Sequence, residues 1–331
     1  MIDQPMYAKL FLKLFTISKS AMHFLEDFSL LLYYWLESLL FFFYPRSLRQ
    51  KDISSDVALI TGAGSGLGRK LALRFSQKVA KLVLVDINEA GLKETINMIK
   101  TIEGCSCYMF VCDISKNGNV QAMAEKIHKE VGNIDILVNN AGVVSGKKFL
   151  DLDEANVLKT FSVNALALYW TCKAFLPHMR ETNHGHIITI SSVAALCGVG
   201  QLTDYCGSKF AANGFHESLW LETKSSGFDG IHFTLVCPHL MGTGMFQGAH
   251  LKVVDKLNPD YVADQIMSGF LTNQDLIYIP RVAYYLHSLK PILPVKCLYV
   301  LNRMMGGTEF MSNFTGRTST VTNGVNGKKH N

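Results

Sequence analysis

The glycine-rich segment from Thr61 to Gly68, TGAGSGLG, constrains the fold more than any other part of the chain. It follows an apolar run of strand-forming residues, Val57 to Thr61, and precedes a segment with the apolar spacing of an amphipathic helix. Glycines at these positions permit a tight turn and a close approach of the backbone to a pyrophosphate. The amino terminus of the following helix offers free N–H groups to that anion. The segment therefore predicts a dinucleotide-binding fold.

An acidic residue at the end of the next apolar run narrows the choice of dinucleotide. Asp86 lies roughly 20 residues past Gly68, where a carboxylate accepts hydrogen bonds from the adenosine ribose and repels a 2′-phosphate. Ser65 and Ile87 are neutral at positions where enzymes that bind the 2′-phosphate tend to carry Arg or Lys. We therefore predict that NAD, rather than NADP, is the cofactor.

From Val57 onward, short apolar runs alternate with amphipathic segments, which is typical of an α/β fold with a single doubly wound (Rossmann) parallel sheet and helices on both faces. The expected strands are 57–61, 82–86, 108–112, 136–139, 186–191, 232–237 and 277–279. The expected helices are 66–79, 89–102, 116–131, 155–180, 204–224 and 260–272. Because no repeat or Pro/Gly linker divides this region, we expect one catalytic domain over residues 53–281, between an amino-terminal segment 1–52 and a carboxy-terminal extension 282–331.

The amino-terminal segment contains a strongly apolar stretch. Residues Phe28 to Tyr44 read FSLLLYYWLESLLFFFY, with Glu37 as the only charge. A membrane-spanning helix needs about 20 apolar residues, so the stretch is slightly short, and an interfacial helix or a shallow hairpin is the alternative. A packed helix of a soluble domain is the third interpretation. We expect an apolar helix that associates with the endoplasmic reticulum membrane or a lipid-droplet surface.

A second apolar stretch, Val282 to Leu301, is interrupted by two prolines and two lysines. This pattern indicates an element that leans on a membrane or covers the substrate, rather than a membrane span. The tail beyond it is polar and carries Asn313-Phe314-Thr315, a glycosylation sequon by pattern, which matters only if the tail is lumenal.

Charge and composition exclude other classes of protein. The net charge of +5 arises from 32 basic and 27 acidic residues without a basic stripe interleaved with aromatic residues, so we expect no nucleic-acid partner. The 8 cysteines and 11 histidines lack metal-ligand spacing, so we expect no metal. Cysteines scattered through apolar segments are typical of reduced thiols, which fits a catalytic domain that faces the cytosol.

Five motifs in order and spacing resemble those of the short-chain dehydrogenase/reductase family. They are Thr61 to Gly68, Asn139 to Gly142, Asn164, Ser192, and the Tyr205-x-x-x-Lys209 sequence. The resemblance covers roughly residues 55–280. Within the family, the chain is similar to the membrane-associated branch of the epidermal type of retinol dehydrogenases and to the related 17-beta-hydroxysteroid dehydrogenases. Lys173 to Pro177 and the residues from Val236 to Phe246 carry that likeness.

The resemblance implies a catalytic group of four residues. Tyr205 and Lys209 lie four apart on an expected helix, so their side chains share one face. A free tyrosine has a pKa of about 10. We expect the Lys209 ammonium and the positive nicotinamide of NAD to favour the phenolate, which accepts the alcohol proton. By resemblance, Ser192, with Ser191 as the alternative, hydrogen-bonds the substrate oxygen, and Asn164 bends its helix and holds a water against the lysine.

The resemblance also implies the cofactor contacts. The expected NAD-binding residues are Gly62, Ser65, Gly66, Leu67, Gly68, Asp86, Asp113, Ile114, Asn140, Ala141, Gly142, Tyr205, Lys209, Pro238 and Thr243. His239 follows Pro238 and is either a substrate contact or an ordinary loop residue. Family members often pair through the helices that contain Asn164 and Tyr205, so we expect a homodimer.

The segment from His239 to Pro259 is expected to fold over the active site. Its adaptable apolar residues are Leu240, Met241, Met245, Phe246, Leu251 and Val253. With the membrane-seeking segments, they predict a lipophilic substrate such as a retinoid or a steroid, which is oxidised to an aldehyde or ketone. The alternatives are a 17-beta-hydroxysteroid dehydrogenase, an NADP-linked carbonyl or retinal reductase, and a non-catalytic lipid-surface protein that keeps the fold as a scaffold.

Overall fold

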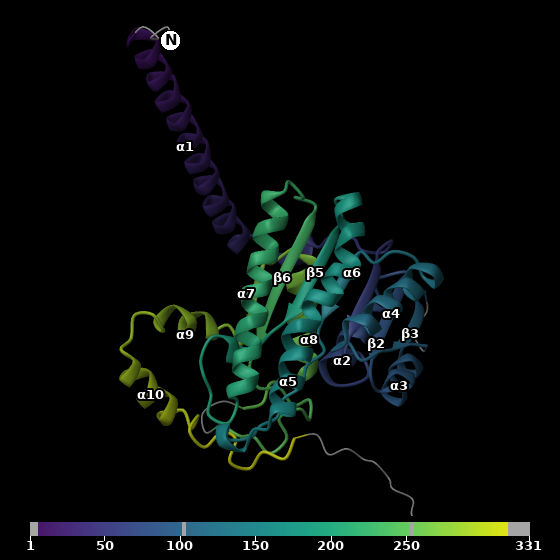
Figure 1. Cartoon of the computed structure of the whole chain (residues 1–331). Coiled ribbons are helices and arrows are strands. Elements are labelled where there is room, and N and C mark those ends of the chain that lie inside the picture. Colours follow the sequence, from purple (N-terminus) through teal and green to yellow (C-terminus); the bar gives the residue numbers. More distant parts are fainter. Residues whose placement is uncertain (1–5, 101–103, 252–254, 317–331) are drawn as a thin grey trace, which may run out of the picture. The chain divides into compact units, whose positions relative to one another are not determined.

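The computed structural model describes residues 6–100, 104–251 and 255–316 (Figure 1). The chain divides into two compact units, Met1–Gln50 and Lys51–Asn331.

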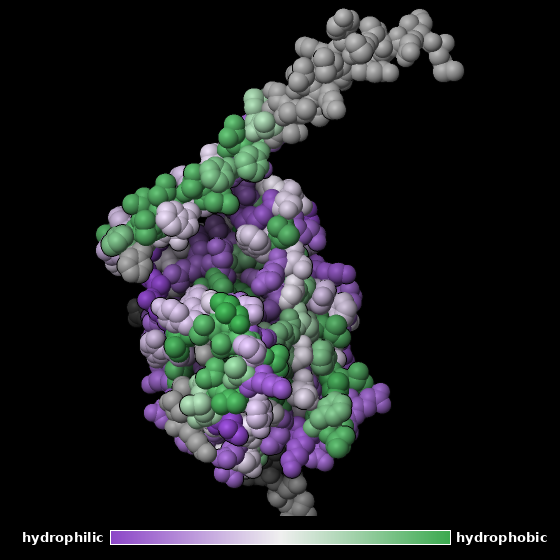
Figure 2. All heavy atoms as spheres, turned by 90° about the vertical axis from the view of Figure 1, so that its left-hand side faces the viewer, coloured by the Kyte–Doolittle hydropathy of each residue, from purple (hydrophilic) through white to green (hydrophobic). Residues whose placement is uncertain are grey.

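The first unit consists of one long helix, α1 (Met6–Phe43), and a short 3-10 turn, η1 (Arg46–Arg49). Large apolar side chains on α1 are exposed, for example Phe24 (68%), Trp35 (64%) and Leu40 (68%). The described side chains of α1 are correspondingly green in Figure 2. Among the residues that the structure describes, no helix combines the length and the apolar character that crossing a membrane requires.

The second unit is built around a parallel sheet of seven strands in the order β3-β2-β1-β4-β5-β6-β7 (Figure 1). The strands are β1 (Val57–Thr61), β2 (Lys81–Asp86), β3 (Ser106–Val111), β4 (Ile136–Asn139), β5 (Gly185–Ile190), β6 (Ile231–Pro238) and β7 (Leu276–Ile279). The order reverses between β1 and β4, and in doubly wound sheets this reversal opens a crevice at the carboxyl ends of the strands. The predicted fold class is confirmed for the sheet and its helices.

All seven predicted strands are present, and most begin one or two residues earlier than the apolar pattern indicates. Ser106 at the start of β3 pairs with Lys81 of β2, and Gly185 of β5 pairs with Ile231 of β6. These pairs involve backbone groups, so the ladder continues into residues whose side chains give no strand signal. Apolar alternation alone therefore underestimates the strand lengths.

Helices cover both faces of the sheet. On one face α2 (Gly66–Phe75), α3 (Glu89–Ile99) and α8 (Pro259–Leu271) pack against buried side chains of the strands, such as Ile60 and Leu84. On the other face α4 (Asn117–Glu130), α6 (Ala167–Thr182) and α7 (Thr203–Ser225) enclose a second core that contains Leu59 and Val85. Because successive strand residues point to opposite faces, Leu59 and Ile60 belong to different cores.

The helix expected over residues 155–180 is present, and a π-helical turn divides it at Asn164, the residue at which the resemblance implied a bend. The structure has α5 (Glu154–Phe161), a π-helical turn over Ser162–Leu166, and then α6. The wider turn contains Asn164, which is 2% exposed and whose side chain bonds to the backbone of another segment. A helix accommodates such a local bond through a π-bulge, a feature frequent at functional sites. Helix α2 ends earlier than predicted, at Phe75 rather than Val79.

After β7 the chain continues as α9 (Ala283–Leu289) and α10 (Val295–Met304), which lie together beside α7 in Figure 1. Residues 306–316 then return to the main body of the unit. The backbone N–H of His250 donates to the Phe310 carbonyl at 3.1 Å, and that of Thr315 donates to Gln247 at 2.9 Å. This return brings the carboxy-terminal extension against the segment that was predicted to cover the active site.

Candidate active site

A cavity of about 940 Å³ lies at the carboxyl ends of the strands. It is lined by residues that follow β1, β2, β3, β4, β5 and β6, as expected of a site in the crevice of a doubly wound sheet. Among the residues predicted from the sequence, the lining contains Gly62, Ser65, Leu67, Gly68, Asp86, Asp113, Ile114, Asn140, Ala141, Gly142, Ser192, Tyr205, Lys209, Pro238 and Thr243. Gly66 and Asn164 lie outside the lining.

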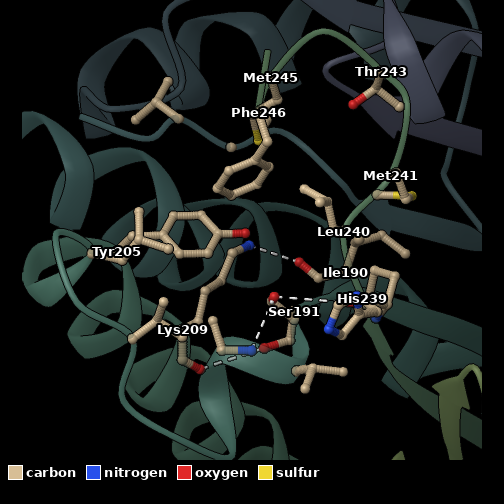
Figure 3. Close-up of a pocket in the computed structure, with 18 of the residues that line it drawn as sticks. Ile190, Ser191, Tyr205, Lys209, His239, Leu240, Met241, Thr243, Met245 and Phe246 are labelled. Atoms are coloured by element: carbon tan, nitrogen blue, oxygen red, sulfur yellow. Dashed lines mark hydrogen bonds between the residues drawn. The ribbon is translucent and has the colours of Figure 1, made fainter. Parts of the chain in front are cut away.

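Tyr205 and Lys209 project from the first turns of α7 into the cavity. Figure 3 shows the phenol oxygen of Tyr205 close to the amine of Lys209, and Nζ lies 5.8 Å from the centre of the tyrosine ring. Tyr205 is 5% exposed, and the ring of Phe246 meets it edge-on with 5.5 Å between centroids. The phenol is therefore held between a cationic side chain and an apolar wall.

Two serines follow β5 directly, and they make different contacts. Ser192 caps the short turn η4 (Val193–Ala195): its Oγ accepts from the Ala194 N–H at 3.1 Å and donates to the Pro238 carbonyl at 3.4 Å. Its hydroxyl also forms a hydrogen bond that lowers the pKa of Tyr205. Ser191 is 3% exposed, and its hydroxyl donates to the Lys209 carbonyl at 3.4 Å. Ser192 is the serine beside the phenol.

Burial dominates the electrostatics of this group. It raises the pKa of Tyr205 above the ordinary value, and the hydrogen bond from Ser192 opposes that effect only in part. Burial also lowers the pKa of Lys209 to about 8, although its Nζ donates to the Ile190 carbonyl at 2.9 Å. Burial therefore disfavours the charged forms of both side chains, and the expectation that Lys209 and the positive nicotinamide together favour the phenolate stays a prediction.

Asn164 lies behind the cavity wall rather than in it. Its Oδ1 accepts from the Val143 N–H at 2.8 Å, and its Nδ2 donates to the Val143 carbonyl at 2.9 Å and to the Ser208 hydroxyl at 3.0 Å. A Cβ on Gly142 would lie 3.4 Å from Asn164 Oδ1 and 3.8 Å from Lys209 Nζ. The asparagine is thus close to the lysine across Gly142, while its predicted water remains a prediction.

The glycine turn has the geometry that a phosphate cradle requires. Gly62 and Gly66 have φ values of +70° and +55°, which favour glycine. A Cβ on Gly68 would collide with the Gly62 carbonyl, so the loop and the first turn of α2 pack backbone to backbone. Ser65, which precedes α2, makes no side-chain hydrogen bond to the helix amides. The residues present therefore fit the pyrophosphate of a dinucleotide.

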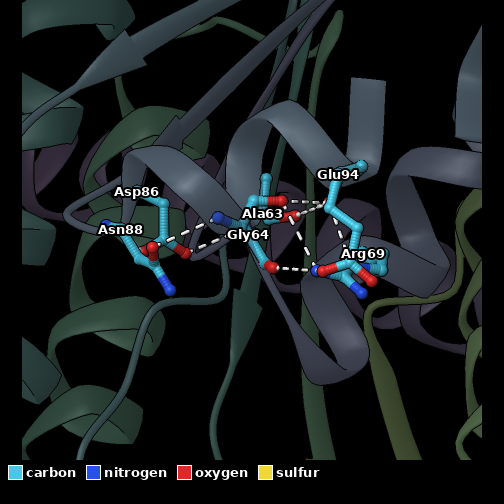
Figure 4. Close-up of polar contacts among 8 residues, drawn as sticks. Ala63, Gly64, Arg69, Asp86, Asn88 and Glu94 are labelled. Atoms are coloured by element: carbon cyan, nitrogen blue, oxygen red, sulfur yellow. Dashed lines mark hydrogen bonds and ion pairs between the residues drawn. The ribbon is translucent and has the colours of Figure 1, made fainter. Parts of the chain in front are cut away.

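Asp86 stands at the carboxyl end of β2 and lines the same cavity. Its two oxygens accept from the backbone N–H groups of Gly64 and Asn88, each at 2.9 Å (Figure 4). Arg69, the cation labelled in Figure 4, donates to the Gly64 carbonyl at 2.5 Å and pairs with Glu94 at 2.7 Å. The carboxylate is thus fixed at the cavity while the guanidinium is engaged within the protein.

The other half of the cavity is apolar. Leu240, Met241, Met245, Phe246 and Leu251 line it, as predicted, whereas Val253 lies outside the described residues. His239 also lines it; burial lowers its pKa, and its buried Nδ1 has no hydrogen-bond partner among the described residues.

The carboxy-terminal extension completes this apolar half, which supports the substrate-covering alternative expected for residues 282–301. The lining includes Lys290, Val295, Leu298, Tyr299, Leu301, Asn302, Met305, Gly307 and Phe310. Phe310 and Met311 belong to the same apolar cluster as Tyr205. The spacing of apolar residues in the stretch 282–301 did not indicate which of them face the site.

Comparison with known proteins identifies the family. Residues 56–253 match the family model for short chain dehydrogenase. The chain is 41% identical over 301 residues to short-chain dehydrogenase/reductase family 16C member 6 of Bos taurus, covering 88% of this chain and 95% of that protein. It is 42% identical over 285 residues to epidermal retinol dehydrogenase 2 of Mus musculus (85% and 92% covered) and 42% over 299 residues to retinol dehydrogenase 10-B of Danio rerio (83% and 89%).

Solved structures of short-chain dehydrogenases/reductases have a similar fold. A short-chain dehydrogenase/reductase from Burkholderia phymatum in complex with NAD has a TM-score of 0.67 at 25% identity, covering 73% of this chain and 95% of that one. A metagenomic short-chain oxidoreductase in complex with NADP has a TM-score of 0.59 at 27% identity, covering 69% and 98%. Such relatives bind either nicotinamide dinucleotide. With its parallel sheet, its glycine turn and the tyrosine–lysine pair in one cavity, the chain belongs to the short-chain dehydrogenase/reductase family of oxidoreductases.

Proposed function

We propose that this oxidoreductase oxidises a retinol-like lipophilic alcohol to the aldehyde, with NAD as hydride acceptor, at a membrane surface. The observation that carries the proposal is the position of Tyr205, at the boundary between the dinucleotide half and the apolar half of one cavity. The relatives that are named retinol dehydrogenases support the class of substrate.

The chain's own residues divide the work at this boundary. Ser192 Oγ orients the alcohol oxygen and continues to hydrogen-bond it as the carbonyl forms. The Lys209 ammonium stabilises the Tyr205 phenolate, and the phenolate oxygen takes the alcohol proton and becomes the neutral phenol. Bound NAD would supply the hydride acceptor and the positive charge of its nicotinamide ring. Since burial raises the pKa of Tyr205, cationic neighbours are needed before the phenolate forms near neutral pH.

The choice of NAD over NADP rests on Asp86. A fixed carboxylate at the cavity edge accepts hydrogen bonds from ribose hydroxyls and repels a 2′-phosphate. The engagement of Arg69 with Glu94 supports the same choice, because its charge is already compensated. A chain built to bind NADP would present a free cation here.

The exposed apolar side chains of α1 support membrane association. The proposed location is the endoplasmic reticulum membrane or the surface of a lipid droplet, with the catalytic unit in the cytosol. The eight cysteines, which are free thiols in the structure, fit a reducing compartment.

The proposed assembly is a homodimer. Leu166 (44% exposed), Tyr169 (43%) and Leu221 (58%) present apolar surface on the helical layer of α6 and α7. Light scattering in detergent measures the mass directly. A Leu166→Glu/Tyr169→Glu variant should shift the particle to the monomer, while an unchanged mass would argue against this interface.

A substrate panel tests the activity. Purified full-length protein is given NAD or NADP with all-trans-retinol, an estradiol-type steroid or a short aliphatic alcohol, and the reduced cofactor is followed by fluorescence. We expect turnover with retinol and NAD, and its loss in Tyr205→Phe. Turnover of the steroid alone would reassign the substrate, and undiminished turnover of the Tyr205→Phe protein would remove the proposed mechanism.

A further inference from the structure

The segment that follows β7 forms a surface of its own. We call residues 281–304 the C-terminal apolar surface. No residue of α10 is buried, although the helix consists mainly of apolar residues. The exposed large apolar side chains of this surface are Val282, Tyr284, Tyr285, Leu289, Ile292, Val295, Tyr299, Val300, Leu301 and Met304. Figure 2 faces the side on which α9 and α10 lie in Figure 1, and green side chains gather there.

The charges of this surface have one sign. Residues 281–304 contain Arg281, Lys290, Lys296 and Arg303, and the next acidic residue along the chain is Glu309. Three tyrosines, at 284, 285 and 299, stand among the aliphatic side chains. Apolar, aromatic and basic residues without acids are the composition of elements that lie in the headgroup layer of an anionic membrane.

The same segment also walls the active site. Leu298, Asn302 and Met305 are half-buried, share one helical face by their spacing, and line the cavity. Ile292 (75% exposed) and Met304 (69%) lie outside the lining and face away from the core. Lys290 Nζ donates to the Leu196 carbonyl at 2.6 Å, which fixes the segment beside the turn that follows Ser192. Val295, Tyr299 and Leu301 are exposed and also line the cavity, so α10 belongs both to the cavity wall and to the outer surface.

We propose that the C-terminal apolar surface docks on an anionic phospholipid bilayer, so that the lipophilic alcohol passes directly between the lipid and the cavity along α10. The alcohol's path rests on the function proposed above, whereas the docking does not. A second copy of this chain is a poorer occupant, because pairing two copies of this surface would bring like charges together.

A fluorophore on Cys297 tests the docking. This cysteine is exposed on α10 and lies outside the cavity lining, so the full-length protein is labelled with a polarity-sensitive dye without a charge substitution. The same labelling of Cys297→Ser gives the signal of the other thiols, which is subtracted. With vesicles of phosphatidylserine and phosphatidylcholine, we expect a blue shift and a rise in intensity, both weaker with pure phosphatidylcholine and in high salt.

Either of two results would overturn the docking. One is an unchanged Cys297 spectrum while the protein sediments with the vesicles, since another part of the chain would then hold it. The other is a blue shift that depends on protein concentration without lipid, since a second copy would then cover the surface.

Charge substitutions test the passage of substrate. Ile292→Glu/Met304→Glu and Lys296→Glu/Arg303→Glu place acids on the surface outside the cavity lining. We expect KM for retinol in anionic vesicles to rise about fivefold for each charge altered, with kcat and the KM for a short soluble alcohol unchanged. The matched control is Leu150→Glu, an apolar side chain that is 91% exposed elsewhere.

The outcomes separate the two proposals. If the wild type turns over no retinol even in detergent micelles, the proposed function fails, and the Cys297 spectrum still decides the docking. If the wild type is active and both double variants match Leu150→Glu in vesicles, the proposed substrate path is overturned while the function stands.

Discussion

The side chain of Asn164 is hydrogen-bonded to both backbone polar groups of Val143, from N–H to Oδ1 at 2.8 Å and from Nδ2 to the carbonyl at 2.9 Å. This pair of bonds ties the π-helical turn between α5 and α6 to the loop that follows β4 and contains Gly142. One buried amide thus connects the helix layer, the cofactor cavity and Ser208, which precedes Lys209.

Replacing Asn164 by Ala should lower turnover at least about tenfold, because two part-buried backbone groups of Val143 lose their partners and the loop at Gly142 shifts. Steady-state kinetics measures the effect, with Asn97→Ala on the exposed side of α3 as control. If Asn164 also carries protons to and from Lys209, the pH profile of turnover moves. An unchanged profile with reduced stability would leave only a structural role.

Replacing Tyr205 by Phe should reduce kcat by about 10² to 10⁴, the range of a lost general acid or base. Binding of NAD, followed by calorimetry, should stay within a few fold, since the ring still packs against Phe246. Tyr278→Phe, a buried tyrosine on β7, is the matched control. Equal losses in the two variants would assign the effect to packing rather than to the hydroxyl.

Replacing Asp86 by Ala should weaken NAD about 10- to 100-fold, as expected for lost hydrogen bonds to a charged group, and should affect NADP less. Asp86→Asn keeps a side-chain acceptor and removes the charge, so it should retain more NAD affinity while NADP improves. Cofactor titrations give the ratio of the two affinities. A ratio that stays constant across all three proteins would show that Asp86 does not select the cofactor.

Replacing Gly68 by Ala should abolish cofactor binding, because the added Cβ collides with the Gly62 carbonyl. Gly118→Ala is the control: it lies in α4, and its added Cβ would meet nothing within 4 Å. That control should be neutral or stabilise by up to about 1 kcal/mol. Comparable loss of NAD affinity in both would refute the close packing of the glycine turn.

Buried histidines should make the protein sensitive to acid. His216 is 4% exposed, its Nδ1 bonds to Thr189 Oγ1 at 2.9 Å, and burial lowers its pKa to about 4. The native state holds it neutral, whereas the unfolded state takes up a proton near the ordinary pKa of about 6.5. Its stabilisation is present above pH 6.5 and is lost as the pH falls toward 4, by about 3 kcal/mol.

Urea unfolding at pH values from 7 to 4 measures this loss. His216→Gln should show a shallower fall in the free energy of unfolding than the wild type, and His250→Gln, at an exposed position, should not. If all three proteins lost stability in parallel, the buried imidazole would not be the source.

The sequence by itself determined the sheet, the cofactor turn and the candidate catalytic group, because these depend on local patterns. The turn from Thr61 to Gly68 depends only on the conformational freedom of glycine. Tyr205 and Lys209 share a face because they lie four residues apart on a helix. The apolar pattern misjudged the strand ends and the end of α2, and only the resemblance indicated a bend at Asn164. Backbone pairing and buried side-chain bonds fix these features, and apolar periodicity does not.

Only the tertiary structure decided how the site is enclosed and how its charges behave. Phe310 and α10 are far along the chain from Tyr205, and no periodicity relates them, yet the return of residues 306–316 brings them to one cavity. Burial then raises the pKa of Tyr205 and lowers that of Lys209 to about 8. Desolvation depends on every atom packed around a group, so it follows from the folded arrangement and not from the spacing of two residues.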